Sequence, residues 1–151
     1  IIEAGAMTYT YFISIFYDEG ARNLYNGLDL FPLREFNFWH YTLSISYRVA
    51  IRIMQAYTAW VVIKCLMRIR VENPFKLDVA QLIEKASYLM LTTWVVAMVH
   101  NLHAYWMSNL VEDFVPTWIS GEFIFAAGLL FVVAQIFKRG VEIQSESELS
   151  V

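Results

Sequence analysis

The stretch from Ala86 to Met107 contains no Asp, Glu, Lys or Arg, and this feature constrains the fold more than any other. About 20 mostly apolar helical residues cross the hydrocarbon core of a bilayer, which is about 30 Å thick. Hydrocarbon offers no partner to free backbone groups, so a spanning segment of this kind has to be helical. The stretch therefore predicts a transmembrane helix.

Three further apolar stretches approach the same length. They cover about 1–17, 47–67 and 118–137, beside the uncharged stretch at 86–107. The first begins at Ile1 without the basic leader of a secretory signal, and we interpret it as the remainder of a membrane helix in a longer product. Together the four stretches predict an all-α integral membrane four-helix bundle, a single transmembrane domain over 1–151.

Composition supports a membrane environment and argues against some partners. Hydrophobic residues make up 58% of the chain and charged residues 17%, whereas soluble domains have about 45–50% and about 25%. The net charge is −3 and no basic run is present, so we expect no direct contact with nucleic acid. Cys65 is the single cysteine, which excludes an intramolecular disulfide and favours a small buried hydrophobe.

The connections between these stretches predict the orientation. Residues 18–46 are polar and aromatic, which indicates a structured external aromatic cap with one or two short interfacial helices. The loop 68–85 contains Asn73-Pro74-Phe75, a sequence suited to starting a helix. Basic residues gather in and around this loop and at the start of the tail 138–151, which places both in the cytoplasm. An even number of spans then makes both termini cytoplasmic.

The end of the chain resembles a known family. Residues 134–137 read Ala-Gln-Ile-Phe, followed by Lys138-Arg139-Gly140 and the ending Glu148-Leu149-Ser150-Val151. This order and spacing resemble the C-terminal signature of a prokaryotic membrane family known as domain of unknown function 2975. The resemblance implies a multi-pass protein of the prokaryotic cytoplasmic (inner) membrane. It supplies no catalytic residue, and because members' genes often lie beside small helix-turn-helix regulators it implies a regulatory partnership.

Ionisable residues within the predicted spans are the candidate site. Charged groups inside a membrane are costly and usually face a partner or water. Counted from the outer ends of the spans, one group of such residues falls in the same layer: Arg48, Arg52, His100, His103 and Glu122. Deeper in the first span, we expect Glu3 to pair with Lys64, with a proton or ion relay as the alternative.

Three interpretations of this outer cluster are open. The first is structural, with polar side chains bridging helices and Arg52 paired with Glu122. The second is a pocket for an anionic ligand or lipid headgroup on Arg48 and Arg52. The third, least favoured, is a metal or haem site on His100 and His103, so we expect no cofactor.

No motif for phosphate binding, nucleophilic catalysis or zinc proteolysis is present, so we expect no catalytic residue. The sequence favours a non-enzymatic accessory protein that binds the lipid bilayer and a protein partner in the membrane or a cytoplasmic regulator. Its expected contact residues are Asn73, Pro74, Phe75, Lys138 and Arg139. The alternative is a protein that binds a small ligand, lipid or ion through the outer cluster.

Overall fold

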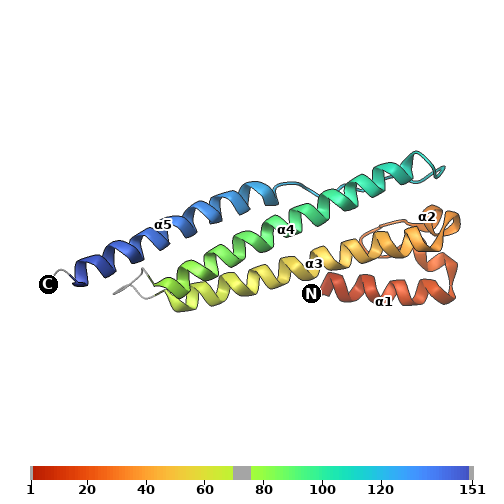
Figure 1. Cartoon of the computed structure of the whole chain (residues 1–151). Helices are drawn as coiled ribbons and strands as arrows, with labels where there is room; N and C mark the ends of the chain where they lie inside the picture. Colours follow the sequence, from red (N-terminus) through yellow and green to blue (C-terminus); the bar gives the residue numbers. More distant parts are fainter. Residues whose placement is uncertain (1, 70–75, 150–151) are drawn as a thin grey trace. The chain divides into compact units, whose positions relative to one another are not determined.

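The computed structural model describes residues 2–69 and 76–149, and these residues form helices and no strand. The helices are α1 (Ile2–Phe16), the short 3₁₀ helix η1 (Asp18–Arg22), α2 (Phe31–Phe36), α3 (Phe38–Arg68), α4 (Leu77–Ser108) and α5 (Phe123–Leu149) (Figure 1). The all-α prediction is confirmed. The predicted loop residues Asn73, Pro74 and Phe75 lie outside the described residues.

Three of the described helices are long and apolar enough to cross a membrane. The spans are Phe38–Arg68, Leu77–Ser108 and Phe123–Glu146. With 31 residues, α3 is roughly 46 Å long and exceeds the hydrocarbon core by about 15 Å. The 15 residues of α1 fall short of the ~20 that span the core, so the predicted first span over 1–17 and the total of four spans stay predictions.

The chain divides into two compact units. The first comprises residues 1–53 and 95–121, and the second comprises residues 54–94 and 122–151. The first unit therefore contains α1, η1, α2, the beginning of α3 and the end of α4. The second unit contains the rest of α3 and α4 together with α5.

The core of the first unit forms where the connection 17–37 folds back on the helices. The buried residues of this core are Met7, Ala21, Leu24, Leu28, Leu30, Leu33, Tyr41, Ile45, Met107, Val111 and Phe114. Four leucines of the connection are almost completely buried, so the connection is structured and shares one apolar core with α1, α3 and α4. Its position outside the membrane stays a prediction.

Turn chemistry explains how this connection reverses direction. Asn26 and Gly27 both have positive φ, of 50° and 76°, as a tight Asn-Gly turn requires. The Leu24 N–H donates to the Leu28 carbonyl oxygen at 3.0 Å across it. At the start of α3, the Asn37 side-chain oxygen accepts the Trp39 N–H at 2.8 Å and satisfies a free donor of the helix end.

The core of the second unit is small and lies between α3, α4 and α5. Cys65, Val79, Ile83 and Ala134 are buried there, which agrees with the expected packing role of the cysteine. The Ser87 hydroxyl donates to the Ala127 carbonyl oxygen at 2.9 Å and joins α4 to α5.

The last helix differs from prediction at both ends. The predicted span began near Trp118, whereas α5 begins at Phe123, because residues before it are held in extended form by side chains of α3 and α4. The predicted tail 138–151 continues α5 through Leu149. Its sequence contains no proline, and Arg139 pairs with Glu142 one turn later at 2.8 Å.

A polar candidate site in the first unit

Asn101 and Arg48 fix the extended segment that precedes α5. The Asn101 Nδ2 donates to the Ile119 carbonyl oxygen, and its Oδ1 accepts the Ile119 N–H, both at 2.9 Å. From α3, the Arg48 Nη2 donates to the Thr117 carbonyl oxygen at 2.9 Å and to the Thr117 hydroxyl. Backbone that is neither helix nor sheet needs such partners wherever water is scarce. Asn101 is not among the residues predicted from the sequence, although its place between His100 and His103 is a signal for it.

Arg52 of the first unit binds Glu3, and its predicted pairing with Glu122 of the second unit stays a prediction. Its Nε lies 2.9 Å from a carboxylate oxygen of Glu3, so this ion pair joins α1 to α3. The expected pairing of Glu3 with Lys64, a residue of the second unit, stays a prediction. In the second unit, the Lys64 ammonium lies 3.5 Å from the ring centroid of Trp60, a cation–π contact.

His100 and Arg48 each have a buried nitrogen that lacks a partner. His100 is fully buried, and its Nε2 finds no hydrogen-bond partner among the described residues. The same holds for the Nε of Arg48, whose charge acts electrostatically on His100. Buried polar nitrogens are nearly always hydrogen-bonded, to protein, water or ligand. The Nε of Arg48 is a donor and suits a small acceptor, whereas the His100 Nε2 is itself an acceptor when its Nδ1 donates to the Asn101 Oδ1, 3.5 Å away.

His103 pairs with a histidine that the sequence analysis overlooked. Its Nε2 lies 3.1 Å from the Nδ1 of His40 at the start of α3. The Trp106 ring contacts both imidazoles nearly edge-on, with centroid distances of 5.8 Å to His40 and 6.5 Å to His103. The Tyr47 ring lies 6.1 Å from that of His100 and 6.3 Å from that of His103. All three histidines of the chain thus lie in the first unit.

The remaining predicted residues lie in the second unit. Glu122 directly precedes α5, and its carbonyl oxygen accepts the N–H groups of Phe125 and Ala126. Lys138 contacts Glu84 at 2.7 Å, which joins α5 to α4, and Arg139 pairs within its own helix. Within residues 2–69 and 76–149 no three His, Cys, Asp or Glu side chains come together as a metal-binding group.

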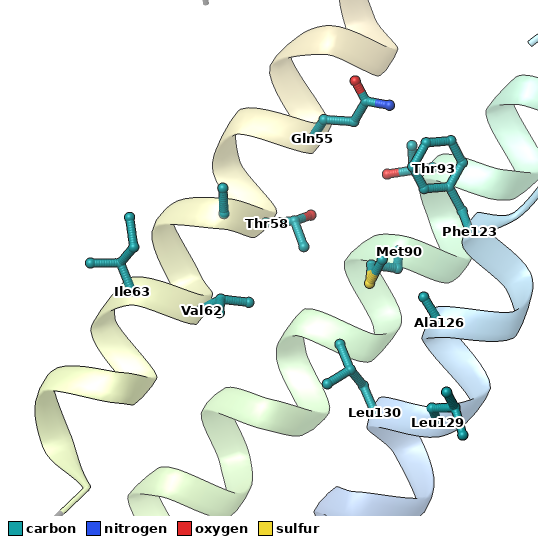
Figure 2. Close-up of a pocket in the computed structure, with 11 residues that line it drawn as sticks. Gln55, Thr58, Val62, Ile63, Met90, Thr93, Phe123, Ala126, Leu129 and Leu130 are labelled. Atoms are coloured by element: carbon teal, nitrogen blue, oxygen red, sulfur yellow. The ribbon is translucent and has the colours of Figure 1, made fainter. Parts of the chain in front are cut away.

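The second unit contains an apolar trough, which we define by the residues that line it. Its volume is about 790 Å³, and its walls are formed by Gln55, Thr58, Ala59, Val62, Ile63, Met90, Thr93, Phe123, Ala126, Leu129 and Leu130. Figure 2 shows Met90 and Thr93 of α4 between the lining side chains of α3 and those of α5. The Thr58 and Thr93 hydroxyls donate to carbonyl oxygens of their own helices, at 2.9 and 2.7 Å.

These features define an α-helical protein with three helices of membrane-spanning length and with polar side chains that bind one another between helices. The family comparison is more specific. Residues 7–151 match the family model described as "Protein of unknown function (DUF2975)", and the chain belongs to this family. Neither the curated proteins nor the solved structures contain a match.

Proposed function

We propose that this chain is a non-enzymatic accessory protein of a prokaryotic inner membrane, which binds one transmembrane helix of a partner protein in the apolar trough. In this proposal the chain crosses the membrane four times, with both termini in the cytoplasm. The observation that carries the proposal is the trough itself, a concave apolar surface lined by three helices of the second unit.

The lining of the trough favours a helix as its occupant. Lipid tails are as apolar as leucine side chains, so helices associate in membranes through close packing and interhelical hydrogen bonds rather than through a hydrophobic driving force. Gln55, Thr58, Ala59 and Val62 follow the spacing of a single helix face, and Ala59 and Ala126 are small. Small side chains on facing helices let a third backbone approach closely.

The continuation of α5 supports a link to the cytoplasm. Helix α5 runs without interruption from the trough residue Phe123 past Lys138 and Arg139 to Leu149. The contact of Lys138 with Glu84 ties this helix to the start of α4. A shift of α5 on partner binding would therefore reach the expected cytoplasmic contact residues.

A variant with a bulky side chain in the trough tests this proposal. In Ala126→Trp the indole occupies the trough, and the matched control Ile136→Trp places it on an exposed position of α5 that does not line the trough. The protein is purified from its native membranes in mild detergent, and proteins that copurify stoichiometrically are identified by mass spectrometry. We expect one partner that is lost in Ala126→Trp and retained in Ile136→Trp. A partner retained in both variants, or no partner with the wild type, contradicts the proposal.

The second candidate function is binding of a small anionic ligand by the first unit. It is favoured by the unpartnered buried Nε of Arg48, a donor on a positively charged side chain. Under this function, Arg48→Lys removes the Nε donor but keeps a positive charge, and it abolishes binding of the small molecule that copurifies with the wild type. Under the first function the same substitution leaves the partner bound.

A further inference from the structure

The sequence-based metal hypothesis joined His100 to His103, whereas the structure joins His103 to His40 across two helices. The two nitrogens that face each other, His40 Nδ1 and His103 Nε2, are 3.1 Å apart. Two nitrogens bound to one Zn²⁺ at about 2.0–2.1 Å, with an angle of about 90–110° at the metal, lie about 2.9–3.4 Å apart. The observed separation falls inside this range.

We propose that His40 and His103 form a binding site for one divalent d-block cation, of the class Cu²⁺, Ni²⁺ or Zn²⁺. Imidazole nitrogen is a preferred ligand for these ions, whereas Mg²⁺ and Ca²⁺ take oxygen. With no third His, Cys, Asp or Glu in place among the described residues, the remaining coordination positions are open to water or to a ligand from outside the chain. This inference is independent of the proposed binding of a partner helix.

The surroundings of the pair support a site for an ion. The Trp106 ring packs nearly edge-on against both imidazoles, so the two candidate ligands share one aromatic neighbour. His103 also lines a hollow of about 480 Å³ together with Val99, Leu102, Tyr105, Trp106 and Asn109. The hollow leaves the His103 side of the pair open to a ligand from outside the chain.

The alternative state of the pair is a hydrogen bond, in which one nitrogen carries the proton and the other accepts it. The ring centroids are 5.3 Å apart with an interplanar angle of 29°, so the rings already lie nearly end to end. An ion displaces the shared proton, and each ring then turns by roughly 40° so that its lone pair points at an ion about 2.0–2.1 Å away. Metal binding and the hydrogen bond therefore use the same two atoms and exclude each other.

The test measures binding of Cu²⁺, which binds nitrogen sites most strongly among these ions. The full chain is purified in detergent with any histidine tag removed, and it is titrated with Cu²⁺ alone. We expect one ion per chain. His40→Gln and His103→Gln keep a hydrogen-bonding side chain but remove the ligand nitrogen, so each should weaken binding at least about tenfold, since even residues that merely support a ligand are worth 10–100-fold. The matched control His100→Gln should bind as the wild type does.

Electron paramagnetic resonance of the Cu²⁺-loaded wild type gives a second readout that does not depend on a variant folding. We expect hyperfine splitting from two imidazole nitrogens. The proposal is overturned by splitting from fewer than two nitrogens or by the absence of saturable binding. It is also overturned if His40→Gln and His103→Gln retain the wild-type affinity, or if His100→Gln loses it.

Discussion

The side-chain amide of Asn101 binds the backbone of Ile119 in both directions, with two hydrogen bonds of 2.9 Å. In this way a single side chain of α4 supplies the donor and the acceptor that a neighbouring strand would otherwise provide. The pairing fixes where the extended segment lies before α5, and it explains why α5 begins at Phe123 rather than near Trp118.

Asn101→Leu tests the structural value of this pairing. The substitution removes both hydrogen bonds and leaves the Ile119 backbone groups unpaired, so we expect a loss of about 2–4 kcal/mol in the free energy of unfolding. Reversible unfolding in mixed micelles measures this loss. Asn109→Leu is the matched control, because Asn109 is exposed in the turn after α4 and its side chain donates to the Tyr105 carbonyl oxygen, four residues earlier. A similar loss in both variants would contradict the assignment.

The Glu3–Arg52 ion pair predicts energetic coupling between α1 and α3. Glu3→Gln and Arg52→Gln should each destabilise the protein, and the double variant should lose less than the sum of the two. We expect a coupling energy of about 1 kcal/mol from a double-mutant cycle, since the two side chains are in direct contact. Additive losses would show that the pair contributes no net attraction.

The hydrogen bond that Ser87 forms between α4 and α5 should contribute measurably to the free energy of unfolding. The buried Ser87 hydroxyl donates to the Ala127 carbonyl oxygen at 2.9 Å, and interhelical hydrogen bonds in membranes average about 0.6 kcal/mol with a maximum near 1.7. Ser87→Ala should therefore lower the free energy of unfolding by about 0.5–1.5 kcal/mol in mixed micelles. Thr92→Ala serves as the control, because Thr92 is exposed and donates within its own helix. An equal effect of both substitutions counts against an interhelical role.

The proposed orientation predicts which positions react with a reagent that cannot cross the membrane. On a Cys65→Ala background, Asp29→Cys and Glu112→Cys should react with an impermeant maleimide added to intact cells. Ser145→Cys should react only after the membrane is permeabilised. Labelling of Ser145→Cys alone in intact cells would show that the orientation is opposite to the predicted one. Labelling of all three positions would contradict the orientation inferred from the distribution of basic residues.

Hydropathy predicted the helical fold well, because the uncharged stretch 86–107 and the other apolar stretches have to be helical if they lie in a bilayer. It could not predict that α3 begins at Phe38, since a hydropathy window reports apolar length and not how far a helix continues beyond it. Residues 38–46 were therefore assigned to the cap. This assignment hid that His40 lies seven residues before Tyr47 on one face of the same helix.

The candidate site was only partly predictable for a related reason. Spacing along one helix shows that His100 and His103 can share a face, but it cannot show which residue on another helix lies opposite. His103 contacts His40 and Arg52 contacts Glu3, residues that are 63 and 49 positions away in the sequence. Such pairings are set by how helices pack, which an isolated sequence does not specify.

The trough is the most direct place to test the proposed accessory function. A photoreactive benzoylphenylalanine is placed at Ala126 or Leu130, which line the trough, and at Ile136, which does not. The cells are irradiated with native membranes intact. The proposal predicts a crosslink to one defined membrane protein from Ala126 and Leu130 and none from Ile136. Crosslinks to lipid alone from the two trough positions, or the same protein crosslinked from all three, would contradict it.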